Sequence, residues 1–342
     1  MPRRPPSLGR TFAKAYQRQL KAVTGAMARA GQGAAKRVRD AAAESTRPPP
    51  GPGDWLAGIA FAAGGACRYH LFVPPPVPGR PARGLPLVVM LHGCRQTARD
   101  FAIGSRMNAL ARREGFLVLY PQQSALANPE GCWNWFSEQR ADAEVGLVLA
   151  AIDQACLLYG ADASRIAVAG LSAGAGLAAR LAMRAPERVQ AVMMHSGVAP
   201  GAATSARQAL GAMSGRRAPV LELAADGAAM LPPLLVVQGG RDTVVRPAAG
   251  RLAAEVWARA VGAEVTDAVT QQRGKRHPMR VTDFRRGRVV EVRLVEIEAL
   301  GHAWSGGSTR GSYTDPAGPD ASRLFWDFAR RAFAAACTPP GV

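Results

Sequence analysis

A serine flanked by glycines is the first feature of the chain that could do chemistry. In "SRIAVAGLSAGAGLAARLAM", Ser172 follows an apolar run and precedes an alanine-rich one, with Gly170 and Gly174 on either side. This Gly-x-Ser-x-Gly spacing is typical of a nucleophile elbow, a tight turn between a strand and a helix that presents a serine hydroxyl. Gly and Ala are abundant in this chain, so the same letters also fit an ordinary loop.

A serine nucleophile needs two partners, and the sequence offers both. The hydroxyl is weak at neutral pH, so it requires a histidine base whose tautomer is fixed by an acid. On an α/β sheet these residues follow in the order Ser, Asp or Glu, His. Asp242 in "LLVVQGGRDTVVRP" directly follows an apolar run, and His302 in "VEIEALGHAWSGG" begins a glycine-rich loop. We therefore predict a catalytic triad of Ser172, Asp242 and His302.

Other residues fit these two roles less well. The competing acids are Asp226, Asp267, Asp283 and Glu298. The first precedes its predicted strand and the others lie further toward the C-terminus, although a loop aspartate at position 242 could also simply cap the next helix. The other histidines are expected in a strand, before a glycine, in the core and in a basic segment, and these are His70, His92, His195 and His277.

Hydrolysis by a serine also needs donors for the developing oxyanion. Two backbone N–H groups normally supply them, and each typically contributes ~3 kcal/mol of transition-state stabilisation. One should belong to Ala173, the residue after the nucleophile, and the other to Cys94 in the "LHGC" loop. The agreement of these signals favours a catalytic Ser172 over a chance match.

The elements around these residues alternate between strand and helix. Apolar runs predict strands at 67–74, 85–93, 115–121, 164–170, 189–197 and 231–240, and helical spacing predicts helices at 101–113, 141–160 and 173–186. The alternation indicates a mainly parallel sheet with helices on both faces, and chemistry is expected at the carboxyl ends of its strands. Residues 280–297 instead predict a hairpin or sheet-edge element with a turn at Arg286–Gly287.

The charge of the chain is concentrated in two segments. The formal net charge is +18, and 15 of these charges belong to residues 1–50 and 271–288, which we interpret as appendages to the fold. Such segments attract anionic partners, although an arginine-rich composition alone produces the same pattern. We expect no specific nucleic-acid partner because neither zinc-finger spacing nor an aromatic-basic RNA motif is found.

The domain organisation follows from composition. Residues 1–50 are predicted to be a basic N-terminal extension with a Pro-rich linker, and residues 51–342 a single catalytic domain. Within the extension, 12–29 suits a basic amphipathic helix that docks on an anionic surface, or else a solvated tail. The stretch "RPPPGPGDW" (47–55) is typical of a stiff linker. Across the chain, no run of 18 apolar residues predicts a membrane span.

Several motifs together resemble the polyhydroxybutyrate depolymerase family of esterases. They are "LVVMLHGCRQTARDFA", "CWNWF", "GLSAGAGLA", "GRDTVV" and "GHAWSGG", in that order. The resemblance implies an α/β-hydrolase fold and the same triad. It also implies a disulfide between Cys94 and Cys132, although two buried thiols are the alternative in a reducing compartment. Trp133, Trp135 and Trp304 are candidates to grip the substrate in an apolar cleft, or else plain core residues.

These features lead to one expected function with two alternatives. We expect a serine esterase that hydrolyses poly- or oligo-(3-hydroxyalkanoates) or small esters through an acyl-enzyme. The alternatives are an acetylxylan or feruloyl esterase and a non-catalytic binding protein on the same fold. No cofactor or metal is expected, since none of the five cysteines forms a C-x-x-C pair. The lack of a signal-peptide pattern favours the cytoplasm, whereas the family's habits favour export.

Overall fold

The computed structural model describes residues 47–79, 81, 83–221 and 231–336. The predicted basic helix at 12–29 therefore lies outside the described residues. From Pro48 onward the chain forms one compact unit. Among the described residues, no helix combines the length and the apolar character that crossing a membrane requires.

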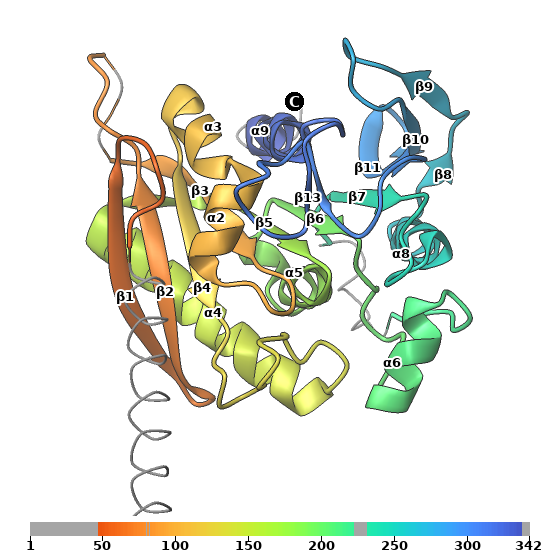
Figure 1. The fold of residues 1–342 in the computed structure, drawn as a ribbon, viewed down its shortest axis with the longest axis horizontal. Helices are drawn as coiled ribbons and strands as arrows, with labels where there is room; N and C mark the ends of the chain where they lie inside the picture. The colour runs from red at the N-terminus through yellow and green to blue at the C-terminus, as the bar shows by residue number, and fades with distance from the viewer. Residues whose placement is uncertain (1–46, 80, 82, 222–230, 337–342) are drawn as a thin grey trace, which may run out of the picture. The chain divides into compact units, whose positions relative to one another are not determined.

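A large mixed sheet organises the fold (Figure 1). In spatial order its strands are β1 (Asp54–Ala62), β2 (Gly65–Val73), β4 (Leu117–Gln122), β3 (Leu85–Leu91), β5 (Ala161–Leu171), β6 (Ala191–His195), β7 (Leu234–Gly239), β11 (Val289–Ile297), β10 (Met279–Arg286) and β8 (Glu264–Val265). The run from β4 to β11 is parallel, and β9 (Val269–Gln271) pairs with β10. A two-stranded sheet joins β12 (Trp304–Ser305) to β13 (Thr314–Asp315).

Helices cover both faces of this sheet, as its apolar runs predicted. All seven residues of β3 are buried, as expected of a strand with both faces covered. One apolar core holds residues of α4 (Glu138–Tyr159), α5 (Ala173–Arg184) and α8 (Pro247–Ala260). The opposite core holds residues of α2 (Ala98–Ser105), α3 (Met107–Glu114) and α9 (Ala321–Ala336). A smaller cluster includes α6 (Ala206–Met213), and a 3₁₀ turn spans Pro186–Arg188.

Two local predictions need correction. The predicted linker at 47–55 runs into β1, which begins at Asp54 and pairs antiparallel with β2. The predicted helix at 101–113 is instead α2 and α3, separated at Arg106, whose φ of 59° interrupts the helical backbone.

The basic segment 271–288 is part of the sheet rather than an appendage. Its second half is β10, which forms the predicted hairpin with β11, and β11 in turn pairs with β7. Arg285 and Arg286 form ion pairs with Asp283 and Glu291. Several of the segment's charges are thus used inside the fold.

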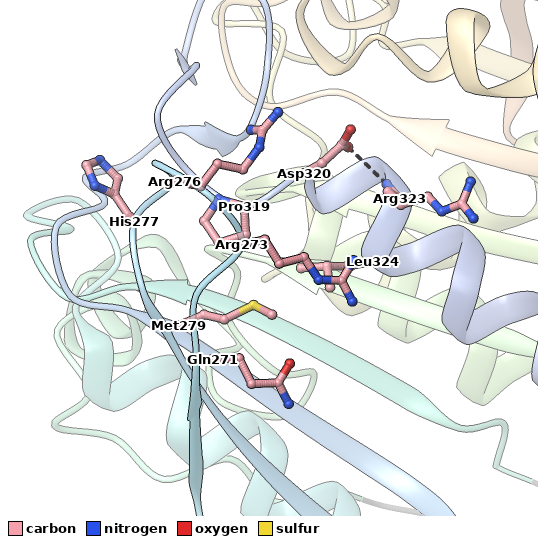
Figure 2. A pocket seen from close by; sticks show the side chains of 9 residues that line it. All are labelled: Gln271, Arg273, Arg276, His277, Met279, Pro319, Asp320, Arg323 and Leu324. Atoms are coloured by element: carbon pink, nitrogen blue, oxygen red, sulfur yellow. Dashed lines mark hydrogen bonds between the residues drawn. The ribbon is translucent and has the colours of Figure 1, made fainter.

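The first half of this segment borders a pocket of about 210 Å³ beside the start of α9 (Figure 2). Arg276 donates to the carbonyl of Gly318 at 2.5 Å, and Arg323 pairs with Glu114 at 2.5 Å. These two guanidinium groups at the pocket therefore hold neighbouring segments of the chain together.

Candidate active site

Ser172 stands on a strained turn between β5 and α5. Its φ of 56° and ψ of −118° lie outside the regions that residues with a Cβ usually adopt. The turn is held because the N–H of Ser172 donates to the carbonyl of His195 at 2.9 Å. The predicted strand-turn-helix context of Ser172 is therefore present.

A close backbone approach explains one of the flanking glycines. A Cβ on Gly174 would lie 2.2 Å from the carbonyl oxygen of Leu91 and 2.6 Å from that of His92. Glycine thus lets the first turn of α5 pack directly against the end of β3. The same contact brings the loop after β3, which contains Cys94, next to the elbow.

Asp242 and His302 meet at the carboxyl ends of β7 and β11. His302 Nδ1 lies 2.8 Å from Asp242 Oδ2, and the other carboxylate oxygen accepts the N–H groups of Val244 and Val245 at 2.9 and 2.8 Å. Burial raises the pKa of Asp242, but the hydrogen bonds from His302 and these amides outweigh it, so the pKa lies below its ordinary value. The carboxylate is therefore ionised at neutral pH and fixes the proton of His302 on Nδ1.

The loops that carry this pair are joined by their backbones. Gly240 N–H donates to Ile297 at 2.9 Å, and Arg241 N–H donates to Leu300 at 2.9 Å. A Cβ on Gly239 would lie 2.3 Å from the carbonyl oxygen of Leu300, so only glycine permits this approach. The distance between the acid and the histidine is thus set by backbone packing.

Ser172 Oγ makes no hydrogen bond to any described residue, and Ser172 is half-buried. The structure thus joins two of the three predicted triad residues directly. The third projects from the end of β5, which β6 separates from β7 in the same parallel sheet. Nucleophile-to-base hydrogen bonds are often loose before substrate binds.

The two predicted oxyanion donors lie on neighbouring backbone segments. Ala173 opens α5, and its N–H is among the first helical donors, which have no partner within the helix. The N–H of Cys94 has no acceptor among the described residues. Both groups therefore remain available for an oxyanion.

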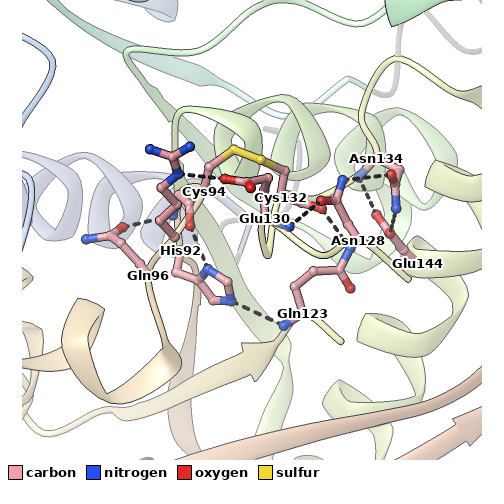
Figure 3. Close-up of a disulfide and its surroundings, with 11 residues drawn as sticks. His92, Cys94, Gln96, Gln123, Asn128, Glu130, Cys132, Asn134 and Glu144 are labelled. Carbon is pink, nitrogen blue, oxygen red and sulfur yellow. Dashed lines mark hydrogen bonds and ion pairs between the residues drawn. A yellow bond between two sulfur atoms is a disulfide. The ribbon is translucent and has the colours of Figure 1, made fainter. Parts of the chain in front are cut away.

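Cys94 and Cys132 form the disulfide that the resemblance implied, with Cα atoms 4.2 Å apart (Figure 3). Next to it, the buried carboxylate of Glu144 accepts the backbone N–H of Asn134 at 2.8 Å and the side chain of Gln123 at 2.5 Å. Burial raises the pKa of Glu144 despite these hydrogen bonds. The loop between β4 and α4, which contains Cys132, is thus anchored by a covalent bond and a buried acceptor.

The three predicted substrate-binding tryptophans have different environments. Trp304 is 1% exposed, stacks on His195 and donates to Ser322, and Trp133 is also 1% exposed. Both rings are buried in the core, which agrees with the alternative that they are plain core residues. Trp135 is half-buried, and its Cβ would lie 3.0 Å from a Cβ on Gly176, one turn along α5 from Ser172.

Three residues near the site were not assigned a role from the sequence. His195, which we expected to be a core residue, is buried and also accepts the N–H of Ser305 at 3.1 Å. Ser305 is the second residue of β12, the short strand that follows His302. Gln238 is buried in β7 and donates to the carbonyl of Val245 at 2.9 Å. A polar letter inside an apolar strand was the available signal for Gln238.

Tyr313 is the third residue without a predicted role. It is 42% exposed, has a φ of 50°, and its ring centre lies 6.5 Å from that of His302. An exposed aromatic ring in a strained backbone conformation beside the histidine is a candidate substrate contact. Its sequence context, a loop of glycine and serine, gave no signal.

The described residues contain no group of three or more His, Cys, Asp or Glu side chains placed to hold a metal ion. The groups that the site presents are a serine hydroxyl, a histidine, a carboxylate and backbone N–H donors. This combination is suited to acyl transfer.

Comparison with solved structures agrees with this fold. An acetyl xylan esterase from Aspergillus awamori superposes with a TM-score of 0.57 at 20% identity, covering 73% of this chain and 94% of that one. The sheet, its helical layers and the elbow define an α/β-hydrolase. Residues 67–276, more than half of the chain, match the family described as Esterase PHB depolymerase, and the protein belongs to that family.

The curated relatives include depolymerases, feruloyl esterases and acetylxylan esterases. Poly(3-hydroxyalkanoate) depolymerase C of Paucimonas lemoignei is 38% identical over 112 residues, 32% of this chain and 27% of the relative. Feruloyl esterase B of Thermothelomyces thermophilus is 26% identical over 222 residues, 59% of this chain and 73% of the relative. The chain thus aligns with only about a quarter of the length of the depolymerase.

Proposed function

We propose that this protein is a serine esterase that hydrolyses ester bonds of poly- or oligo-(3-hydroxyalkanoates). The observation that carries the proposal is the hydrogen bond between His302 and the buried Asp242, at the same sheet edge as the elbow of Ser172. Family membership and the depolymerase relatives support the substrate class.

Each residue of the triad has a defined task in this proposal. His302, with its proton held on Nδ1 by Asp242, takes the hydroxyl proton of Ser172 through Nε2 as the serine attacks the ester carbonyl. The N–H groups of Cys94 and Ala173 stabilise the oxyanion. The protonated histidine then gives its proton to the leaving alcohol, and water cleaves the acyl-enzyme with His302 again as base.

An apolar surface beside the elbow is suited to the organic part of such an ester. Trp135 and Phe136 are in edge contact, with ring centres 5.6 Å apart, and border a cavity of about 330 Å³ that Arg180, Arg184 and Glu138 also line. Val198 and Val245 belong to the apolar cluster against which both rings pack. We assign Trp135 to substrate contact on this basis.

A carbohydrate esterase acting on feruloyl or acetyl groups is the second candidate. The feruloyl esterase relative aligns with twice as many residues as the depolymerase, and it is covered over 73% of its length. Both candidates use the same triad, so the substrate alone distinguishes them.

Product analysis of the purified wild type and Ser172→Ala tests the function. The substrates are 3-hydroxybutyrate oligomers, p-nitrophenyl esters of graded acyl length, methyl ferulate and acetylated xylan. We expect release of 3-hydroxybutyrate that falls by at least ~10³-fold in Ser172→Ala. Release of ferulate or acetate alone would favour the second candidate function, a carbohydrate esterase. Full activity of Ser172→Ala, or failure of Ser172 to react with a fluorophosphonate, would favour a binding protein.

The basic N-terminal extension is proposed to attract an anionic surface. Its eleven Lys and Arg residues against two acids support this, and a cytoplasmic location is proposed with it. Comparing salt-dependent binding of the full chain and of a chain lacking residues 1–46 to anionic vesicles and to polymer granules would test the proposal. Equal binding of the two chains would contradict it.

A further inference from the structure

His92 is a buried residue that the mechanism above does not use. It follows β3, is fully buried, and precedes the glycine and cysteine of the donor loop. Its Nδ1 lies 2.8 Å from the carbonyl oxygen of Gly93, and its Nε2 accepts the N–H of Gln123 at 3.2 Å (Figure 3). The ring therefore bridges the same two loops that the disulfide joins.

The partners of the ring determine its tautomer. Because the backbone N–H of Gln123 points at Nε2, this nitrogen carries a lone pair and the proton is on Nδ1. Nδ1–H can then donate to the Gly93 carbonyl. Burial lowers the pKa of His92 to about 4, which keeps the ring neutral at the pH where an esterase of this kind would work.

The carbonyl that His92 holds belongs to the same peptide unit as the Cys94 N–H. The peptide is planar, and the described residues contain no cis peptide bond, so the C=O of Gly93 and the N–H of Cys94 point in opposite directions. A hydrogen bond that fixes the carbonyl toward the buried ring therefore fixes the N–H away from it. The side chain of Gln96 accepts the N–H of Gly93 at 2.9 Å and restrains the preceding peptide, and the N–H of Gln96 donates to the Gly93 carbonyl at 3.3 Å, a longer bond than that of the His92 ring.

We propose that His92 is a positioning residue that orients the Gly93–Cys94 peptide so that the Cys94 N–H faces the oxyanion. The inference rests on the proposed function, since it assigns a part of the same hydrolytic site. If the peptide rotated, the carbonyl oxygen of Gly93 would replace the N–H and repel the developing charge. His92 would then act through this peptide and not touch the substrate.

Two substitutions by amide side chains each keep one of the two hydrogen bonds of the His92 ring and remove the other. In His92→Asn the side-chain amide can donate from near the Nδ1 position but does not reach the N–H of Gln123. In His92→Gln the side chain can accept from Gln123 but places no donor at the Nδ1 position, so the Gly93 carbonyl keeps only the longer hydrogen bond from the N–H of Gln96 at 3.3 Å. We expect His92→Gln to lower kcat on a p-nitrophenyl ester by ~10²-fold with KM within about twofold, as for loss of one oxyanion donor. His92→Asn should remain within about tenfold of the wild type.

Binding of an aryl boronic acid, which mimics the tetrahedral oxyanion, should weaken in parallel with kcat across the two variants. A matched control is His70→Asn, because His70 is a buried histidine whose ring nitrogens have no hydrogen-bond partner among the described residues. His70→Asn should lower thermal stability but should not lower kcat at unchanged KM, as we expect of His92→Gln. Equal kcat in His92→Gln and His92→Asn, with both folded, would overturn the proposal.

A measurement on the wild type tests the proposal even if the variants do not fold. The ¹⁵N shifts of the His92 ring should show a neutral imidazole with its single proton on Nδ1 at every pH between 5.5 and 9. An Nε2–H tautomer would overturn the proposal regardless of activity. Loss of Ser172-dependent hydrolysis in the wild type would instead contradict the proposed function, and the two failures are therefore distinguishable.

Discussion

At the scale of single residues, the site depends on the buried carboxylate of Asp242, both of whose oxygens accept hydrogen bonds. Asp242 uses one oxygen for His302 and the other for two backbone amides, so its side chain has a single orientation. Asp283, a competing acid in the sequence, is instead bonded to Arg293 at 2.6 and 2.9 Å in β11. Asp242 at the site and Asp283 in β10 can therefore be compared as two hydrogen-bonded aspartates in different surroundings.

Substitution of these aspartates should separate catalysis from stability. Asp242→Asn keeps the size of the side chain but no longer selects the Nδ1–H tautomer of His302, so kcat should fall by ~10³–10⁴-fold. Asp283→Asn should leave kcat near the wild-type value and lower the free energy of unfolding by roughly 1–3 kcal/mol, because it weakens hydrogen bonds to a charged group. Steady-state kinetics and urea unfolding of both variants measure this, and a comparable loss of kcat in Asp283→Asn would contradict the assignment.

At the scale of elements, the elbow requires α5 to begin in contact with β3. A methyl group at position 174 would overlap two carbonyl oxygens, whereas Gly211 in α6 has open space around its Cβ position. Glycine is therefore required in the first turn of α5, whereas a larger residue fits at position 211 in α6.

Replacing each glycine by alanine should show this difference. Gly174→Ala should displace the elbow, reduce soluble yield and abolish turnover, because backbone atoms cannot yield to the new methyl group. Gly211→Ala should raise the free energy of unfolding by about 0.5–1 kcal/mol through helix propensity. Thermal unfolding and kcat/KM report both effects. Wild-type turnover in Gly174→Ala would show that the close packing at the elbow is not needed.

The sequence predicted those elements whose burial leaves a simple pattern. Strands buried on both faces appear as apolar runs, and the residues after them could be placed at one sheet edge. β1 was missed because "DWLAGIAFA" is half-exposed and mixes small and large residues. The break at Arg106 falls on a residue that is itself a good helix former, and Gly104 and Ser105 just before it were not recognised as a signal.

The site was predictable where chain order determines chemistry, and not where packing does. Ser172, Asp242 and His302 follow strands in the order that the fold requires. Whether Trp304 faces a cleft or the core depends on its stacking with His195, which no local pattern contains. The task of His92 depends on Gln123, thirty-one residues away, and is likewise a tertiary property.

At the scale of the whole molecule, three buried histidines make the fold sensitive to acid. Burial lowers the pKa of His70 and His92 to about 4, and that of His195 to about 3. In the unfolded chain these rings titrate near 6.5. Between these values the unfolded chain binds protons that the folded chain does not, so the free energy of unfolding decreases as the pH falls below about 6.5.

Urea unfolding at pH 7.5 and pH 5 should show this loss, with roughly 2 kcal/mol for each histidine at the lower pH. His70→Phe should flatten the dependence, because it removes one titrating ring and keeps the stacking on Trp55. Equal midpoints at the two pH values would show that these rings are charged or exposed in the native state.

The disulfide at Cys94 has a consequence for the timing of maturation. The residue that would stabilise the transition state is also covalently joined to the loop that ends at Cys132, so the donor loop reaches its final restraint only after oxidation. In a newly made chain with both thiols reduced, the proposed donor at Cys94 would be less restrained. Hydrolytic power would then increase when the two thiols are oxidised, and the thiol pair would delay full activity until the disulfide has formed.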